Sequence, residues 1–75
     1  MAVRKRSISI SGHATSFSLE DDFWTALLEL AALEGQSVAA LVKKIDENRR
    51  ADANLSSAIR TALLSAARQG RLSGN

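Results

Sequence analysis

Thr15-Ser16-Phe17-Ser18-Leu19-Glu20-Asp21-Asp22-Phe23-Trp24 is the stretch that decides the fold. Its first half alternates polar and apolar residues with the period of a β-strand, which we expect over about residues 14–19. Its second half opens with three acidic residues, which suit the positive end of a helix dipole, so we expect a helix over about residues 20–34. Ser18 is the expected N-cap of this helix.

Two more helices are predicted after this stretch. Gly35 is expected to end the first helix, because glycine readily takes the left-handed conformation found there. Ser37 is the expected N-cap of a second helix over about residues 37–50, in which apolar residues recur at helical spacing. Asn54 is the expected N-cap of a third helix over about residues 55–69, whose apolar side is rich in alanine.

The N-terminal residues contain a second strand signal, whose partner the sequence leaves open. Residues 7–10 alternate with period two, and Gly12 indicates a turn or bulge after them. This piece could pair with residues 14–19 as a hairpin, or a strand could pair with its copy in a second chain. The domain organisation we expect is a flexible basic arm over residues 1–6, one domain over residues 7–69 and a frayed tail over residues 70–75.

Chain length favours an oligomer. A chain of 75 residues buries only about 60% of the surface that its unfolded form exposes, so a lone monomer is expected to be marginally stable. The absence of cysteine excludes disulfides and Cys-rich zinc sites, which leaves association of copies as the means of stabilisation. No apolar run reaches the roughly 20 residues of a membrane span, and the start lacks the apolar core of a signal peptide. We therefore expect a cytoplasmic homodimer with no membrane partner.

Charge is unevenly distributed along the chain. Residues 1–18 carry a net charge of +3 and residues 19–35 a net charge of −5. A basic segment beside an acidic helix indicates one face suited to a polyanion and another kept away from it. The basic residues expected to contact phosphates are Arg4, Lys5 and Arg6.

No group of residues points to catalysis or to a cofactor. Asp21 and Asp22 have no accompanying nucleophile, base or glycine-rich phosphate loop, so a role at the helix dipole is favoured. His13 is the only histidine and is expected in a turn rather than in a metal site. Phe23 and Trp24 are expected to fill the core rather than to stack on bases. The sequence thus predicts neither an enzyme, nor a metal, nor a cofactor.

The order of these motifs resembles the ribbon-helix-helix superfamily of Arc/MetJ/CopG type, and within it a bacterial subgroup. The resemblance rests on residues 16–24, on residues 35–42, and on the apolar positions Leu27, Leu30 and Ala31. It is closest to a subgroup whose pattern is matched by Lys5-Arg6-Ser7, Gly12-His13 and Asn54-Leu55-Ser56-Ser57. The fold that it implies is mainly α with a short N-terminal β-ribbon: an intertwined homodimer, extended here by a third C-terminal helix. The dimer core implied by this fold contains Phe17, Leu19, Phe23, Trp24, Leu27, Leu30, Val38, Leu41, Val42 and Ile45.

The resemblance also implies a transcriptional regulator that inserts a two-stranded ribbon in the major groove of DNA. Its base-facing residues would be Ala14, Ser16 and Ser18. A phosphate would be bound at the start of the second helix, by Ser37 and the N–H groups of Val38 and Ala39.

The ribbon differs from those of family members that recognise specific DNA sequences, because alanine and serine discriminate little between bases. The alternative is therefore a protein-interaction module, antitoxin-like or an adaptor, with weak or no sequence-specific DNA binding. In that case the third helix is expected to contact the protein partner. The other interpretation of the third helix is that it only covers the core.

Overall fold

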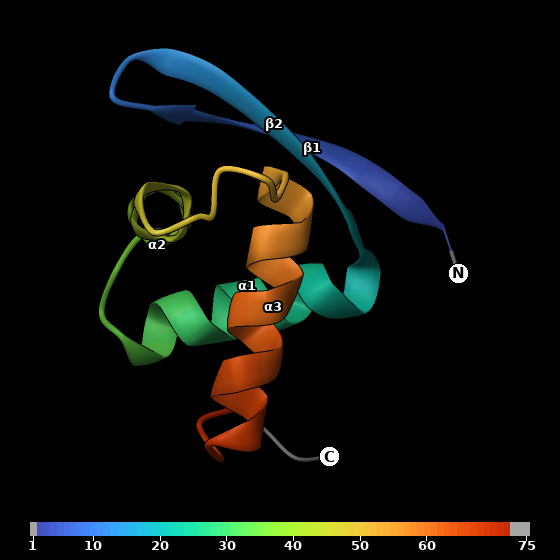
Figure 1. Ribbon diagram of the computed structural model, residues 1–75. Helices are drawn as coiled ribbons and strands as arrows, with labels where there is room; N and C mark the ends of the chain where they lie inside the picture. The colour runs from blue at the N-terminus through green and yellow to red at the C-terminus, as the bar shows by residue number, and fades with distance from the viewer. Residues whose placement is uncertain (1, 73–75) are drawn as a thin grey trace.

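The computed structural model describes residues 2–72 (Figure 1). It begins with an antiparallel hairpin formed by β1 (Val3–Ile10) and β2 (His13–Glu20). Ile10 pairs with His13 across a turn in which Ser11 and Gly12 have φ angles of 52° and 80°. Positive φ at both positions is the mark of a type I′ turn, whose twist matches that of the strands it joins. Of the two pairings that the sequence leaves open, the structure has the hairpin within one chain.

β1 is longer than the sequence predicts. Residues 3–6 were assigned to a flexible basic arm, and this prediction is wrong, because they pair in register with residues 17–20 of β2. Side chains reinforce the pairing, since Arg4 and Arg6 reach the same carboxylate oxygen of Asp21 at 3.2 and 3.3 Å. Met1, the first residue of the predicted arm, lies outside the described residues.

Three helices follow the hairpin: α1 (Asp21–Leu33), α2 (Val38–Glu47) and α3 (Leu55–Arg68). The expected cap of α1 is wrong: Glu20 occupies the N-cap position without a side-chain cap bond, and Ser18 still belongs to β2. α2 ends three residues before the predicted position 50, where the Asn48 side chain donates to the Lys44 carbonyl oxygen at 2.8 Å.

The other predicted helix ends are confirmed. Ser37 accepts a hydrogen bond from the Ala40 N–H at 3.1 Å, and Asn54 accepts one from the Ser57 N–H at 2.8 Å. Gly35 lies just beyond the end of α1 and has a φ of 67°. The N–H groups of Gly35 and Gln36 donate to carbonyl oxygens in the last turn of the helix, which is the pattern of a Schellman motif.

α1 and α2 are bent by 98° at the turn between them, and α3 packs against both. The hairpin lies over the start of α3, with α2 below its turn and α1 leading away from its other end (Figure 1). Among residues 2–72 no single helix is long and apolar enough to cross a membrane. Only α1 and α2 taken together reach that length and composition.

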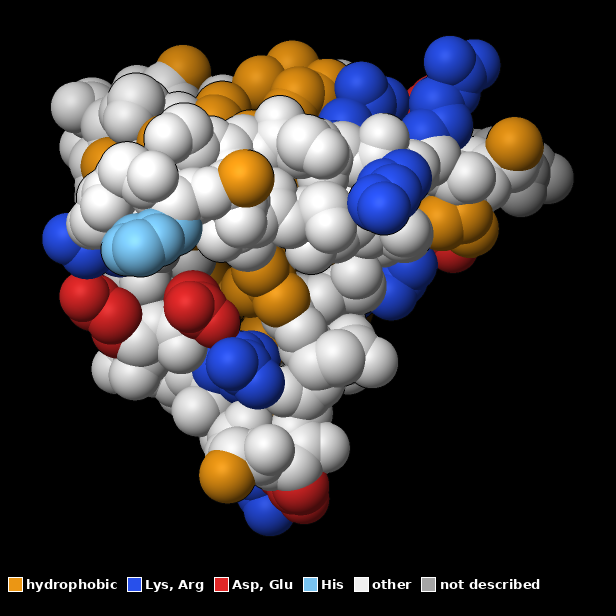
Figure 2. Space-filling view, turned by 90° about the horizontal axis from the view of Figure 1, so that it is seen from above, with side chains coloured by type: hydrophobic (Ala, Val, Ile, Leu, Met, Phe, Trp, Pro, Cys, Tyr) orange, Lys and Arg blue, Asp and Glu red, His pale blue; other side chains and the backbone are white. Residues whose placement is uncertain are grey.

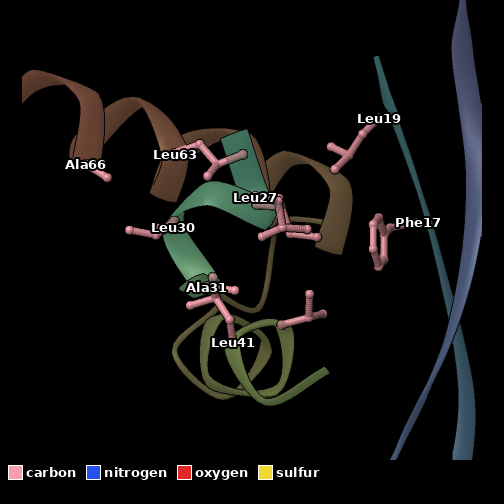
Figure 3. Close-up of a cluster of buried hydrophobic side chains, with 10 residues drawn as sticks. Phe17, Leu19, Leu27, Leu30, Ala31, Leu41, Leu63 and Ala66 are labelled. Carbon is pink, nitrogen blue, oxygen red and sulfur yellow. The ribbon is translucent and has the colours of Figure 1, made fainter. Parts of the chain in front are cut away.

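The core is built from residues of β2 and of all three helices (Figure 3). Leu19, Leu27, Val42 and Ile59 are fully buried. Six of the residues predicted for a dimer core are buried within the single chain, and Phe23, Trp24, Val38 and Ile45 pack half-buried against them. α3 contributes Ile59, Leu63 and Ala66, so it completes the core rather than standing apart from it.

The segment after α3 is ordered as far as Leu72, so the predicted frayed tail is wrong for residues 70–72. Gly70 has a φ of 76° and the Arg71 N–H returns to the Ala66 carbonyl oxygen at 3.0 Å. The Arg71 guanidinium pairs with Glu34, and Leu72 packs against the core. Residues 73–75 of the predicted tail lie outside the described residues.

Candidate nucleic-acid interface

The hairpin has an inner face on the helices and an outer face in solvent. Cross-strand partners share a face, so the register assigns each residue. Apolar residues of the inner face, such as Phe17 and Leu19, are buried in the core. The outer face is formed by Val3, Lys5, Ser7, Ser9, Ala14, Ser16, Ser18 and Glu20. Viewed from the hairpin side, much of the surface carries neither charged nor hydrophobic side chains (Figure 2).

The ribbon residues predicted from the sequence all lie on this outer face. Ala14 and Ser16 are exposed, and Ser18 is half-buried. The structure adds residues from β1, because Lys5, Ser7 and Ser9 are the cross-strand partners of Ser18, Ser16 and Ala14. The alternation of residues 7–10 was the sequence signal for Ser7 and Ser9, although it did not identify their partner strand.

The predicted basic arm is divided between the two faces. Lys5 lies on the outer face, whereas Arg4 and Arg6 are on the inner face with Asp21. The Arg6 guanidinium also lies 4.3 Å from the centroid of the Trp24 ring, a distance typical of a cation–π contact. Lys5 is therefore the one member of this basic group that the hairpin presents directly to solvent on its outer face.

The N-terminal half of α3 holds the free edge of β2. The Ser18 N–H donates to Ser56 Oγ at 2.9 Å, and the Arg60 guanidinium donates to the Ser18 carbonyl oxygen at 3.1 Å. Arg60 also pairs with Glu20 at 3.1 Å. Sequence reasoning missed these three contacts, which join residues 38 to 42 positions apart and leave no local periodicity.

Glu20 has a shifted titration. A hydrogen bond from its own backbone N–H and another from the Arg60 guanidinium hold the pKa of the Glu20 carboxyl below its ordinary value of 4.5. Because the carboxylate is the favoured form in the folded chain, its contribution to stability is present above pH 4.5 and is lost as the pH falls through the lowered pKa.

We expect Glu20→Gln to weaken the acid dependence of stability. Between about pH 5 and pH 3 the free energy of unfolding should fall less steeply in this variant than in the wild type, because one preferentially ionised carboxylate is gone. Urea denaturation at a series of pH values measures this slope. Glu47→Gln removes an exposed carboxylate at the end of α2 and serves as the control. Equal slopes in the wild type and in Glu20→Gln would contradict the assignment.

The start of α2 supplies amide groups for an anion. Ser37 Oγ accepts from the Ala40 N–H, and Leu41 donates the first backbone bond of the helix to the Ser37 carbonyl. The N–H groups of Val38 and Ala39 precede that bond and point out of the helix end. These are the groups to which the family resemblance gives phosphate binding.

Two grooves flank α3. One, of about 440 Å³, lies between α2 and α3, with Leu30, Leu41 and Ile45 among its apolar walls and Lys44, Arg49 and Arg71 among its charged residues. The other, of about 370 Å³, is lined from α1 and α3. Within the described part of the chain, no cluster of three or more His, Asp or Glu side chains is placed to hold a metal ion.

Comparison with known families gives one match. The family model for the ribbon-helix-helix domain matches residues 3–67, which include both strands and nearly all of α3. No curated protein and no solved structure matches the chain significantly.

Proposed function

Because the chain belongs to the ribbon-helix-helix family, we propose that it is a homodimeric transcriptional regulator that binds duplex DNA. Domains of this family are generally DNA-binding regulators without enzymatic activity, and they typically dimerise. A regulator of this kind would act in the bacterial cytoplasm.

The observation that carries the proposal is the outer face of the hairpin. It is mostly exposed, and its central side chains are serine and alanine, small enough for a groove floor to approach the backbone. The major groove of B-DNA is about 12 Å wide and admits a two-stranded ribbon. The one carboxylate on this face, Glu20, is neutralised by Arg60, so little on the ribbon repels a polyanion.

Affinity in this proposal comes mainly from phosphates. The N–H groups of Val38 and Ala39 bind one phosphate at the start of α2, where the helix dipole favours an anion. Lys5 supplies a cation on the ribbon itself. Arg4 and Arg6 can contact phosphates only when their ion pairs with Asp21 are broken, so we assign them a smaller share of the affinity for DNA. Serine hydroxyls at the base edges donate to or accept from almost any base, and we expect modest sequence preference.

A polarisation titration of labelled duplexes tests the proposal, with random-sequence and genomic fragments compared over a salt series. We expect binding at about 50 mM salt that weakens steeply by 200 mM, as counterion release requires. Light scattering on the same samples establishes the oligomeric state. A dimer that binds neither kind of duplex at low salt would overturn the proposal.

The Lys5→Ala variant should bind DNA less tightly and with a weaker salt dependence. Loss of one cation from each subunit lowers the slope of log K against log salt by about 1–2, because fewer counterions are released. Arg68→Ala is the matched control, since it removes the same charge from an exposed position in the last turn of α3, away from the ribbon. Equal slopes for the two variants would remove Lys5 from the interface.

A second candidate function is favoured by the groove between α2 and α3. Its apolar walls suit an amphipathic helix of another protein. In this alternative the chain is an antitoxin-like or adaptor module. Purification from the source cell with and without nuclease separates the two functions: a stoichiometric protein partner that survives nuclease supports the alternative, and co-purifying DNA supports the first.

A further inference from the structure

Asp21, the first residue of α1, is the point at which two cations of β1 meet. The Arg4 Nε atom and the Arg6 guanidinium lie 3.2 and 3.3 Å from the same oxygen of its carboxylate. Two guanidinium groups share one carboxylate, so the cluster as a whole keeps a net positive charge. The two cations of this cluster are restrained to different degrees.

Arg6 is the more firmly held of the two. Its side chain is only 26% exposed, and its guanidinium lies over the Trp24 ring as well as beside Asp21. Its Nε atom is buried and has no hydrogen-bond partner within residues 2–72, so Trp24 and Asp21 together set its position. Arg6 is therefore poorly placed to reach another molecule, and it fixes the carboxylate of Asp21.

Arg4 is held by Asp21 alone. Its side chain is 64% exposed, and in the described part of the chain this carboxylate is the one group with which it pairs. An exposed ion pair of this kind changes an equilibrium by a factor of about five at most, so a competing anion can break it. The next residue, Lys5, lies on the outer face of the hairpin.

We propose that Asp21 competes with DNA phosphates for Arg4 and so weakens the binding of every duplex, whatever its sequence. This inference rests on the proposed DNA-binding function and identifies a residue that limits it. With Lys5 facing the groove, Arg4 stands at the edge of the same ribbon, where a phosphate can replace the carboxylate. Contacts with phosphates carry no sequence information, so Asp21 lowers only the sequence-independent part of the affinity.

Asp22 supplies a matched control for a variant of Asp21. It is the next residue in the first turn of α1, it is exposed, and its side chain forms no ion pair within residues 2–72. Asp21→Asn and Asp22→Asn remove the same charge from the same turn, so both lose a similar interaction with the helix dipole. Circular dichroism and urea denaturation check that both variants fold. The difference between them then isolates the ion pairs of Asp21 from a general loss of negative charge.

A polarisation titration against random-sequence duplex over a salt series tests the proposal. We expect Asp21→Asn to bind at least about fivefold more tightly than Asp22→Asn, with a slope of log K against log salt that is steeper by about 1–2, because one cation of each subunit is released. Arg4→Ala should weaken binding less than about twofold in the wild type, but it should remove most of the gain in the Asp21→Asn background. Equal affinities of the two Asn variants, or the same effect of Arg4→Ala in both backgrounds, would overturn the proposal.

The reaction of arginine with phenylglyoxal separates a failure of this inference from a failure of the proposed function, because it needs no DNA. With the modified positions mapped by mass spectrometry, Arg4 should react about two- to fivefold faster in Asp21→Asn than in Asp22→Asn, as expected when an exposed ion pair is lost. Equal rates would overturn the restraint of Arg4 by Asp21. A faster reaction in a protein that binds no duplex would support this restraint and overturn the proposed DNA-binding function instead.

Discussion

Replacing Ile59 with alanine is expected to lower the free energy of unfolding by about 2–5 kcal/mol, the usual cost of deleting a large buried aliphatic group. Ile59 is fully buried in the N-terminal half of α3, where it packs into the core shared by the hairpin and the helices. A domain of this length has a total stability of about 4–11 kcal/mol, so the loss is a large part of the whole. Urea denaturation followed by circular dichroism measures it.

Leu64→Ala is the control on the same helix. Leu64 is 56% exposed, so its truncation should change the free energy of unfolding by less than about 0.5 kcal/mol. If both variants changed the free energy of unfolding by equally small amounts, α3 would be a peripheral helix that folds independently of the domain. The sequence left this choice open, because its alanine-rich stripe is compatible with both a core helix and a partner-binding helix.

Local signals predicted most of the fold. Alternation located β2, apolar spacing located the three helices, and residues such as Ser37, Gly35 and Asn54 marked helix ends that the structure confirms. Each of these signals acts within a few residues, through a single cap bond or one backbone conformation. A sequence therefore carries them without any knowledge of what packs against the element.

Errors arose where the deciding contact is distant in sequence. Arg4 and Arg6 look like part of a flexible arm, because nothing nearby indicates that Asp21 and Trp24 will receive them. Ser18 looks like a helix cap, because its bond to Ser56 joins positions 38 residues apart. The outer face of β2 was predictable from alternation alone, whereas the contribution of β1 required the register.

The start of α2 offers a substitution whose effects on folding and on DNA binding should have opposite signs. Ala40 is exposed and occupies the third position of α2, after the Ser37 cap. Glu at this position completes a capping box, in which its carboxylate reaches the Ser37 N–H. Ala40→Glu should therefore stabilise the folded chain by about 0.3–1 kcal/mol, because a negative charge is favourable at the start of a helix.

The same carboxylate would stand where we place the DNA phosphate. Two negative charges about 4 Å apart near a protein surface repel by about 4 kcal/mol, and the dimer has two such sites. We expect the affinity of Ala40→Glu for duplex DNA to fall at least about tenfold in the polarisation titration. Ala40→Gln completes the capping box without the charge, so it should keep both the added stability and most of the affinity. Equal affinities of the Glu and Gln variants would show that no phosphate binds at Val38 and Ala39, and the DNA would then be held by the ribbon alone.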